Sequence, residues 1–264
     1  MKNIRPTAVA GMFYPGDQAT LAREVRDMLA MARPSELHPK ALIVPHAGYV
    51  YSGPIAASGY VALKNIATRI RRVVLLGPTH RVAVRGLALP GAEAFATPLG
   101  AVQVDVAAAK AIAALSSVIV SPLAHAQEHS LEVQLPFLQS VLTDFKVLPL
   151  AVGDATAEEV ADVLERLWGG AETLIVISSD LSHYLPYEQA RHVDGTTVQD
   201  ILDLEQGILH EQACGATPVN GMILAARRHH LTPHLLDLRN SGDTAGSRDG
   251  VVGYAAVAFT GEEA

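Results

Sequence analysis

Short apolar runs alternate with longer amphipathic segments along this chain, and each pattern predicts one kind of secondary structure. The apolar runs cover residues 41–44, 72–76, 146–150, 174–177 and 251–259. Each run is continuous, short and bounded by turn residues. We therefore expect five strands that are buried on both faces of a sheet.

Between these runs, apolar residues recur with the spacing of an amphipathic helix. The apolar stripes lie within residues 21–29, 131–142 and 160–167. Strands that alternate with helices predict a layered α/β fold.

Two prolines and one loop refine this prediction. Pro54 follows Ser-Gly, and its fixed φ suits a first helical turn, so we expect a helix over residues 54–64. Pro136 lies inside the stripe at 131–142 and should kink or split that helix. Residues 240–249 are rich in Gly, Ser and Asp and predict a loop before the last strand.

Composition adds limits on domain number and partners. We expect a single domain over residues 1–264, because 49% of the chain is hydrophobic and no tandem repeat, low-complexity tract or long linker interrupts it. Charged residues make up 18%, and the formal net charge is -7. No cluster of Lys and Arg provides the footprint that nucleic acid or an anionic membrane requires, so we expect neither as a partner.

The sequence also indicates the location of the protein and the redox state of its thiol. No apolar stretch approaches the ~20 residues that span a bilayer. The first six residues lack the apolar core of a secretory signal, so we expect the cytoplasm, where thiols stay reduced. Cys214 is the only cysteine, which excludes an intrachain disulfide and leaves open whether its thiol is inert or chemically used.

The residues with the most chemical interest directly follow predicted strands. They are His46, His80 and the pair Asp180 and His183, which come after the runs that end at residues 44, 76 and 177. The carboxyl ends of neighbouring parallel strands meet at one crevice, so these side chains should converge. Two or three neutral imidazoles that converge form a transition-metal site.

Other polar residues could complete such a site. Cys214 lies in a turn-like segment and offers a soft donor, although a lone cysteine is more often a small buried hydrophobe. Asp180 could be a ligand, a base or the acceptor that fixes a histidine tautomer. Glu128 and His129 precede an apolar stripe, so they fit either helix capping or a proton-transfer pair at the pocket rim.

Structural interpretations compete with these functional ones. Pro and Gly beside His46 and His80 indicate shaped loops, which favours metal ligands over turn histidines. Asp180 and His183 fit equally well a hydrogen bond that closes a turn and two groups that face one pocket. His129 should support the ligands or face a substrate.

The remaining aromatic candidates favour structural roles. We expect solvated or helix-end positions for His125, His192, His210, His229, His230 and His234. Tyr49 and Tyr51 should pack their rings against the core.

Five ordered segments and the amino terminus resemble the MEMO (mediator of cell motility) family. The segments are residues 44–53 (VPHAGYVYSG), 77–80 (GPTH), 128–136 (EHSLEVQLP), 178–183 (SSDLSH) and 214–218 (CGATP). The opening from Arg5-Pro6 to Tyr14-Pro15 is similar to that family's amino-terminal signature. The resemblance covers nearly the whole chain.

This resemblance implies a three-layer α/β/α sandwich with a mainly parallel mixed central sheet, related to the class III extradiol dioxygenases, which are non-haem iron enzymes. It implies a metal pocket with His46, His80 and Cys214 at ligand positions and with Asp180 and His183 lining the pocket. It also implies a role as AmmeMemoRadiSam system protein B, with radical-SAM and AMMECR-type proteins as partners.

One departure from the dioxygenases changes the expected chemistry. Those enzymes use two histidines and a glutamate, whereas the third matching position here is Cys214. A thiolate is a softer donor and moves the metal preference toward copper or zinc.

The leading hypothesis is a metal-dependent oxidoreductase of unknown substrate that holds copper or iron, with zinc also compatible. In it, His46, His80 and Cys214 bind the metal. The catalytic group comprises Asp180, His183, His129 and Glu128, which orient ligands or move protons.

Two other hypotheses use the same residues. The pocket could belong to a non-catalytic module that binds a peptide, a small molecule or a metal ion. Alternatively, Cys214 could be the nucleophile of a metal-free hydrolase, activated by a neighbouring imidazole.

Overall fold

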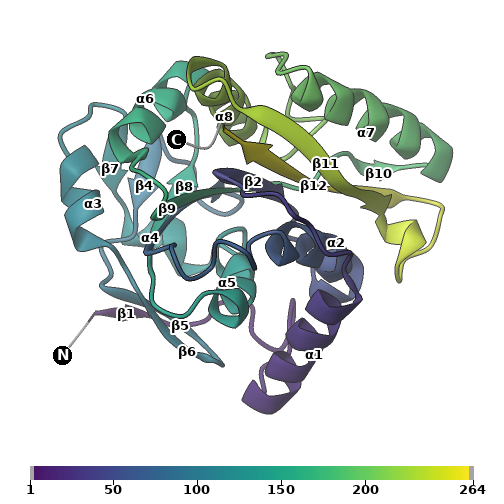
Figure 1. The fold of residues 1–264 in the computed structure, drawn as a ribbon, viewed down its shortest axis with the longest axis horizontal. Coiled ribbons are helices and arrows are strands. Elements are labelled where there is room, and N and C mark those ends of the chain that lie inside the picture. Colours follow the sequence, from purple (N-terminus) through teal and green to yellow (C-terminus); the bar gives the residue numbers. More distant parts are fainter. Residues whose placement is uncertain (1–2, 262–264) are drawn as a thin grey trace.

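The computed structural model describes residues 3–261, which form three layers with one large sheet between two sets of helices (Figure 1). In this part of the chain the large sheet has nine strands, in the order β10-β12-β2-β9-β3-β8-β4-β7, with β11 also paired to β12. Its strands are β2 (Ala41–Val44), β3 (Arg72–Pro78), β4 (Leu87–Leu89), β7 (Val118–Val120), β8 (Lys146–Val152), β9 (Thr173–Ser178), β10 (His183–Leu185), β11 (Thr232–Asn240) and β12 (Val251–Thr260). The central strands β2, β9, β3 and β8 are parallel, whereas β12 and β4 run antiparallel to them. The expected mainly parallel mixed sheet is confirmed.

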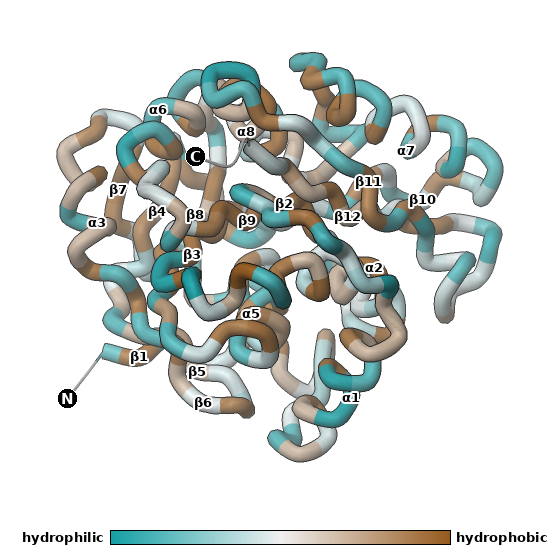
Figure 2. Tube along the Cα trace, viewed as in Figure 1, coloured by the Kyte–Doolittle hydropathy of each residue, from teal (hydrophilic) through white to brown (hydrophobic). Residues whose placement is uncertain are grey.

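Helices cover both faces of this sheet, because alternate residues of each central strand point to opposite sides. In β2, Leu42 and Val44 join one core and Ala41 and Ile43 join the other. The first core includes helices α1 (Gln18–Met31), α2 (Tyr49–Val61) and α5 (Leu135–Val141), and the second includes α3 (Val106–Ile112), α6 (Ala157–Leu167), α7 (Tyr187–Leu202) and α8 (Ala216–Arg228). In Figure 2 the hydrophobic colour concentrates along the central strands between these helices.

The remaining elements are short. They are the helix α4 (Pro122–Ala126), the 3-10 turns η1 (Glu132–Gln134) and η2 (Ser241–Asp243), and a small sheet of β1 (Ile4–Arg5), β5 (Ala94–Thr97) and β6 (Gly100–Gln103). β1 pairs in parallel with β5, so the amino-terminal segment is attached below the main sheet.

The five predicted strands and three predicted helices are confirmed. Local capping explains two of the helix starts: Asp17 accepts a hydrogen bond from Thr20 N–H at 2.8 Å before α1, and Thr156 and Glu159 form a capping box at the start of α6. The stripe at 131–142 is split into η1 and α5, and Pro136 lies in the first turn of α5, as its lack of an N–H predicts.

The prediction that Pro54 opens a helix to residue 64 was wrong. Helix α2 begins at Tyr49 and ends at Val61, so Pro54 lies inside it. Pro54 cannot donate to the carbonyl of Val50, but Val50 is exposed and water can satisfy that oxygen. Gly48 is the N-cap of α2, and its carbonyl oxygen accepts from the N–H of Ser52 at 3.1 Å, so the first helical turn forms before Pro54.

Candidate metal centre and its surroundings

The predicted convergence at the strand ends is present in the structure. β2, β9 and β3 are adjacent parallel strands, and His46, Asp180 and His80 follow their carboxyl ends. The backbone N–H of His46 donates to Asp180 Oδ1 at 2.7 Å, which ties the end of β2 to the end of β9.

A buried network fixes the tautomer of His46, which is only 1% exposed. Ser178 Oγ donates its single proton to the carbonyl oxygen of Ser130 at 2.6 Å and accepts a hydrogen bond from Gln134 Nε2 at 2.7 Å. Its remaining lone pair faces His46 Nδ1 at 3.0 Å, so that nitrogen must carry the proton. His46 Nε2 therefore carries the lone pair, which faces the Cys214 sulfur at 3.2 Å.

The pKa of His46 supports the same protonation state. Burial, followed by the repulsion of nearby imidazoles, holds the pKa of His46 well below its ordinary value. The ring is neutral near pH 7, which is the form that binds metals.

Glu128 fixes the tautomer of His80 in a similar way. Its carboxylate accepts hydrogen bonds from His80 Nδ1 at 2.8 Å and from His80 N–H at 2.5 Å. The N–H groups of His129 and Ser130 also donate to it, each at 2.9 Å. Burial alone would raise the pKa of Glu128, but these bonds outweigh it and lower the pKa to about 2. The ionised carboxylate can only accept, so His80 Nδ1 carries a proton and Nε2 is the atom left for a metal ion.

His129 completes a group of three imidazoles. One ligand atom from each of His46, His80 and His129 lies within 4.8 Å of the other two. The rings of His80 and His129 stack at 4.5 Å between centroids, and His46 meets both edge-on. Burial, and then the charge of His80, lowers the pKa of His129 to about 4. Three imidazoles at such separations could hold a transition-metal ion.

Cys214 lies beside this group. Its Sγ is 3.2 Å from His46 Nε2. Two ligands of one tetrahedral ion, at ~2.0 Å for nitrogen and ~2.3 Å for sulfur, are about 3.5 Å apart, so this spacing is compatible with a shared ion. Burial, reinforced by Asp180, raises the pKa of the thiol to about 12. The sulfur is a thiol at neutral pH and would ligate only after it loses its proton.

The predicted site residues line two neighbouring cavities. His80 and Cys214 line one of about 340 Å³. His129, Asp180 and His183 line another of about 490 Å³, together with the rings of Tyr51, Tyr184, Tyr254 and Phe13. Tyr51 therefore faces a cavity rather than the core, and the prediction for it was wrong. Tyr49 packs between Tyr14 and Phe137 as predicted.

Asp180 and His183 face the second cavity and do not simply close a turn. Burial raises the pKa of Asp180 to about 7, although hydrogen bonds from the N–H groups of His46 and Ala47 act in the opposite direction. Partial burial, followed by the neighbouring charge of His80, lowers the pKa of His183 below its ordinary value. The cavity thus holds one group that exchanges a proton near neutral pH beside a neutral imidazole.

Comparisons with known proteins agree with the motifs. The family model described as Memo-like protein matches residues 5–258. A MEMO1 family protein of Aquifex aeolicus is 38% identical over 270 residues, which cover 97% of this chain and 99% of the relative. A MEMO1 family protein of Methanosarcina barkeri is 35% identical over 271 residues, which cover 96% of this chain and 99% of that relative.

This chain belongs to the Memo family. A solved structure with a related fold is that of an uncharacterised protein, JW3007, of Escherichia coli K12. It superposes with a TM-score of 0.54 at 16% identity and covers 84% of this chain and 99% of that chain. At this identity the likeness shows the fold alone. Within residues 3–261, no helix of this Memo-family protein is both long and apolar enough to cross a membrane.

Sequence reasoning missed the polar groups that support the imidazoles. Ser178 and Gln134 fix His46, and Gln134 also donates to the carbonyl oxygen of Pro45 at 2.9 Å. Glu132 and Gln134 alternate with apolar residues in a segment that was expected to bury its apolar side. Polar residues that interrupt such a stripe were the available signal of a buried network.

A second buried network anchors this segment to the amino terminus. The Arg5 guanidinium pairs with the Glu132 carboxylate and donates to the carbonyl oxygens of His125 at 2.9 Å and Glu128 at 2.7 Å. Glu132 also accepts from the Tyr14 hydroxyl at 2.5 Å. His125 lies at the end of a helix, as predicted, but it is buried rather than solvated.

Proposed function

We propose that this Memo-family protein is a metal-dependent oxidoreductase whose ion is held by the imidazoles of His46, His80 and His129, with the sulfur of Cys214 as a fourth donor. The observation that carries the proposal is that the Nδ1 atoms of His46 and His80 are both already engaged in hydrogen bonds. Because Ser178 and Glu128 each accept from one Nδ1–H, the Nε2 atoms of His46 and His80 are the ones left to bind a metal ion, and binding at His46 would replace its contact with the Cys214 thiol.

The donor set favours copper or iron as the redox ion. Imidazole suits copper, iron and zinc, and a thiolate strengthens the preference for copper or zinc. A copper or iron ion bound there would supply one-electron chemistry that none of these side chains provides. Zinc would fill the same site without redox chemistry.

The chain's own residues can bind a small substrate and exchange its proton. The cavity of about 490 Å³ is lined by His129 and by aromatic rings that can pack against a small substrate. Asp180, with a pKa raised to about 7 by burial, can accept or return a proton at neutral pH. His183 is neutral under the same conditions and could orient a hydroxyl group.

Oxygen consumption tests this proposal. Protein reconstituted with copper or with iron is supplied with catechol or ascorbate, and His46→Ala is the matched variant. We expect metal-dependent consumption that His46→Ala abolishes and Asp180→Asn slows with a changed pH profile. Stoichiometric metal without turnover of either reductant would overturn the oxidoreductase and favour a binding module.

A further inference from the structure

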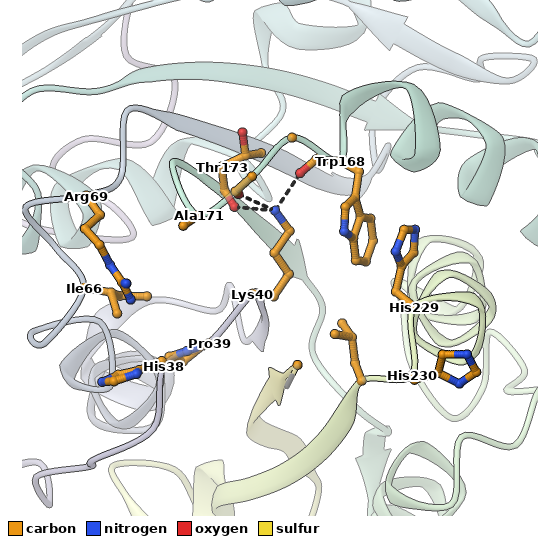
Figure 3. Close-up of a pocket in the computed structure, with 14 residues that line it drawn as sticks. His38, Pro39, Lys40, Ile66, Arg69, Trp168, Ala171, Thr173, His229 and His230 are labelled. Atoms are coloured by element: carbon orange, nitrogen blue, oxygen red, sulfur yellow. Dashed lines mark hydrogen bonds between the residues drawn. The ribbon is translucent and has the colours of Figure 1, made fainter. Parts of the chain in front are cut away.

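A third cavity lies at the opposite end of the same strands. Its volume is about 740 Å³, and its walls come from the connections at residues 38–40, 66–69, 168–173 and 229–231 (Figure 3). These segments adjoin the amino ends of β2 and β9, whereas the imidazole site adjoins their carboxyl ends. The cavity is therefore separate from the candidate metal centre.

Lys40 places an ammonium group in the wall of this cavity. Its Nζ donates to the carbonyl oxygens of Trp168, Gly170 and Thr173 at 2.6, 2.9 and 2.9 Å. These acceptors are neutral, and among residues 3–261 no carboxylate oxygen lies within 4.0 Å of Nζ; the nearby Glu172 carboxylate acts on Lys40 over a longer distance. Burial lowers the pKa of Lys40 to about 8, and Glu172 opposes that shift, so the ammonium remains mostly charged at pH 7.

Arg69 and His230 add donors that nothing else uses. Both residues are exposed, and neither side chain has a hydrogen-bond or ion-pair partner in the part of the chain that the structure describes. The residues that line the cavity include no Asp or Glu within that part. Lys40 and Arg69 bring two positive charges to a cavity whose lining, within residues 3–261, includes no carboxylate, and such a cavity attracts anions.

Trp168 is not available as a stacking surface for a ligand. His229 stacks on one face, with 3.6 Å between ring centroids, and Lys40 Nζ lies over the ring at 5.3 Å. Figure 3 shows His229 and Lys40 on opposite sides of the indole. The remaining apolar walls are aliphatic, from Ile66 and Leu231. An aliphatic group fits these walls without needing a free aromatic face.

We propose that this cavity binds an aliphatic phosphate monoester, with the dianion between Lys40 and Arg69 and the aliphatic part against Ile66 and Leu231. The two positive charges match the two negative charges of the phosphate. The planar Arg69 guanidinium can donate two parallel hydrogen bonds to its oxygens, whereas Lys40, whose protons are already committed, contributes charge.

Trp168 gives a direct readout, because it is the only tryptophan in the chain. Its fluorescence is titrated with n-butyl phosphate, inorganic phosphate, butyrate and butanol. We expect n-butyl phosphate to bind most tightly, inorganic phosphate more weakly and butanol not at all. Equal binding of butyrate and n-butyl phosphate would overturn the assignment to a phosphate.

Matched variants locate the binding. Arg69→Gln should weaken n-butyl phosphate at least tenfold, whereas Arg26→Gln, the same change at an exposed arginine outside the cavity, should leave it unaltered. His46→Ala should also leave it unaltered, because the proposal does not depend on the metal centre. Equal affinity in Arg69→Gln and Arg26→Gln, or no change in Trp168 fluorescence with any probe, would contradict the proposal.

Discussion

The two ends of β2 and β9 carry opposite chemistry. At the carboxyl ends, imidazoles and a protonated thiol converge next to buried carboxyl groups. At the amino ends, Lys40 and Arg69 surround an open cavity that no carboxylate lines within residues 3–261. One sheet thus presents electron-pair donors at one end and positive charge at the other.

The two ends also differ in how firmly they are held. The imidazole site is supported by buried residues that accept hydrogen bonds, namely Glu128, Glu132 and Ser178. The cavity at the other end depends on Lys40 and on exposed side chains. A site that must hold an ion needs fixed donors, whereas an anion site can rely on charge and adapt to its ligand.

The largest expected effect is on stability, at the buried network behind the imidazoles. Glu132→Ala leaves the Arg5 guanidinium buried without its carboxylate and removes the acceptor for the Tyr14 hydroxyl. We expect a loss of about 3–5 kcal/mol in the free energy of unfolding, measured by urea denaturation. Arg69→Gln, at the exposed end, should change it by no more than about 0.5 kcal/mol. Similar losses in the two variants would remove the distinction between the ends.

The second effect is on metal affinity. Glu128→Gln replaces the anion that holds His80 Nδ1–H with a neutral amide. We expect a loss of about 10- to 100-fold in affinity for copper or zinc, measured by competition with a coloured chelator. The control is Glu159→Gln, because the partner of Glu159 is the exposed Arg85 at the surface. If Glu128→Gln binds metal as tightly as Glu159→Gln, Glu128 does not support a ligand.

The smallest expected effect is on the pH dependence of metal affinity, which distinguishes ligation by Cys214 from ligation by the imidazoles. The pKa of the thiol is raised to about 12, so ligation by sulfur must release a proton throughout the neutral range. Affinity should then fall about tenfold for each unit of pH from 8.5 to 7.5, and Cys214→Ser should lose that dependence. The pKa of His129 is about 4, and that of His46 is also lowered, so protonation of these two rings weakens binding only at lower pH. Identical pH profiles for Cys214→Ser and the unaltered protein would exclude a thiolate ligand.

Much of the imidazole site could be predicted, because functional residues often follow the carboxyl ends of parallel strands and the motifs of this sequence lie there. His46, His80 and Asp180 each directly follow an apolar run, so one rule about parallel sheets brings them together. His129 was expected beside the ligands rather than among them. Its position depends on how Arg5 and Glu132 anchor the preceding segment, and sequence spacing does not report such long-range contacts.

The opposite end of the sheet gave no such signal. Lys40, Arg69, Trp168 and His230 come from four separate connections and belong to no motif.

Strand β11 was missed for a related reason. It is a half-buried edge strand whose Pro233, His234, Asp237 and Arg239 interrupt the apolar pattern.

Metal content tests the central claim most directly. The protein is purified without added metal and analysed for copper, iron and zinc, beside His46→Ala, His80→Ala and Arg69→Gln. We expect about one equivalent of a single transition metal in the unaltered protein and in Arg69→Gln, and almost none in the two histidine variants. Equal metal content in all four proteins would contradict a metal centre at the carboxyl ends of the strands.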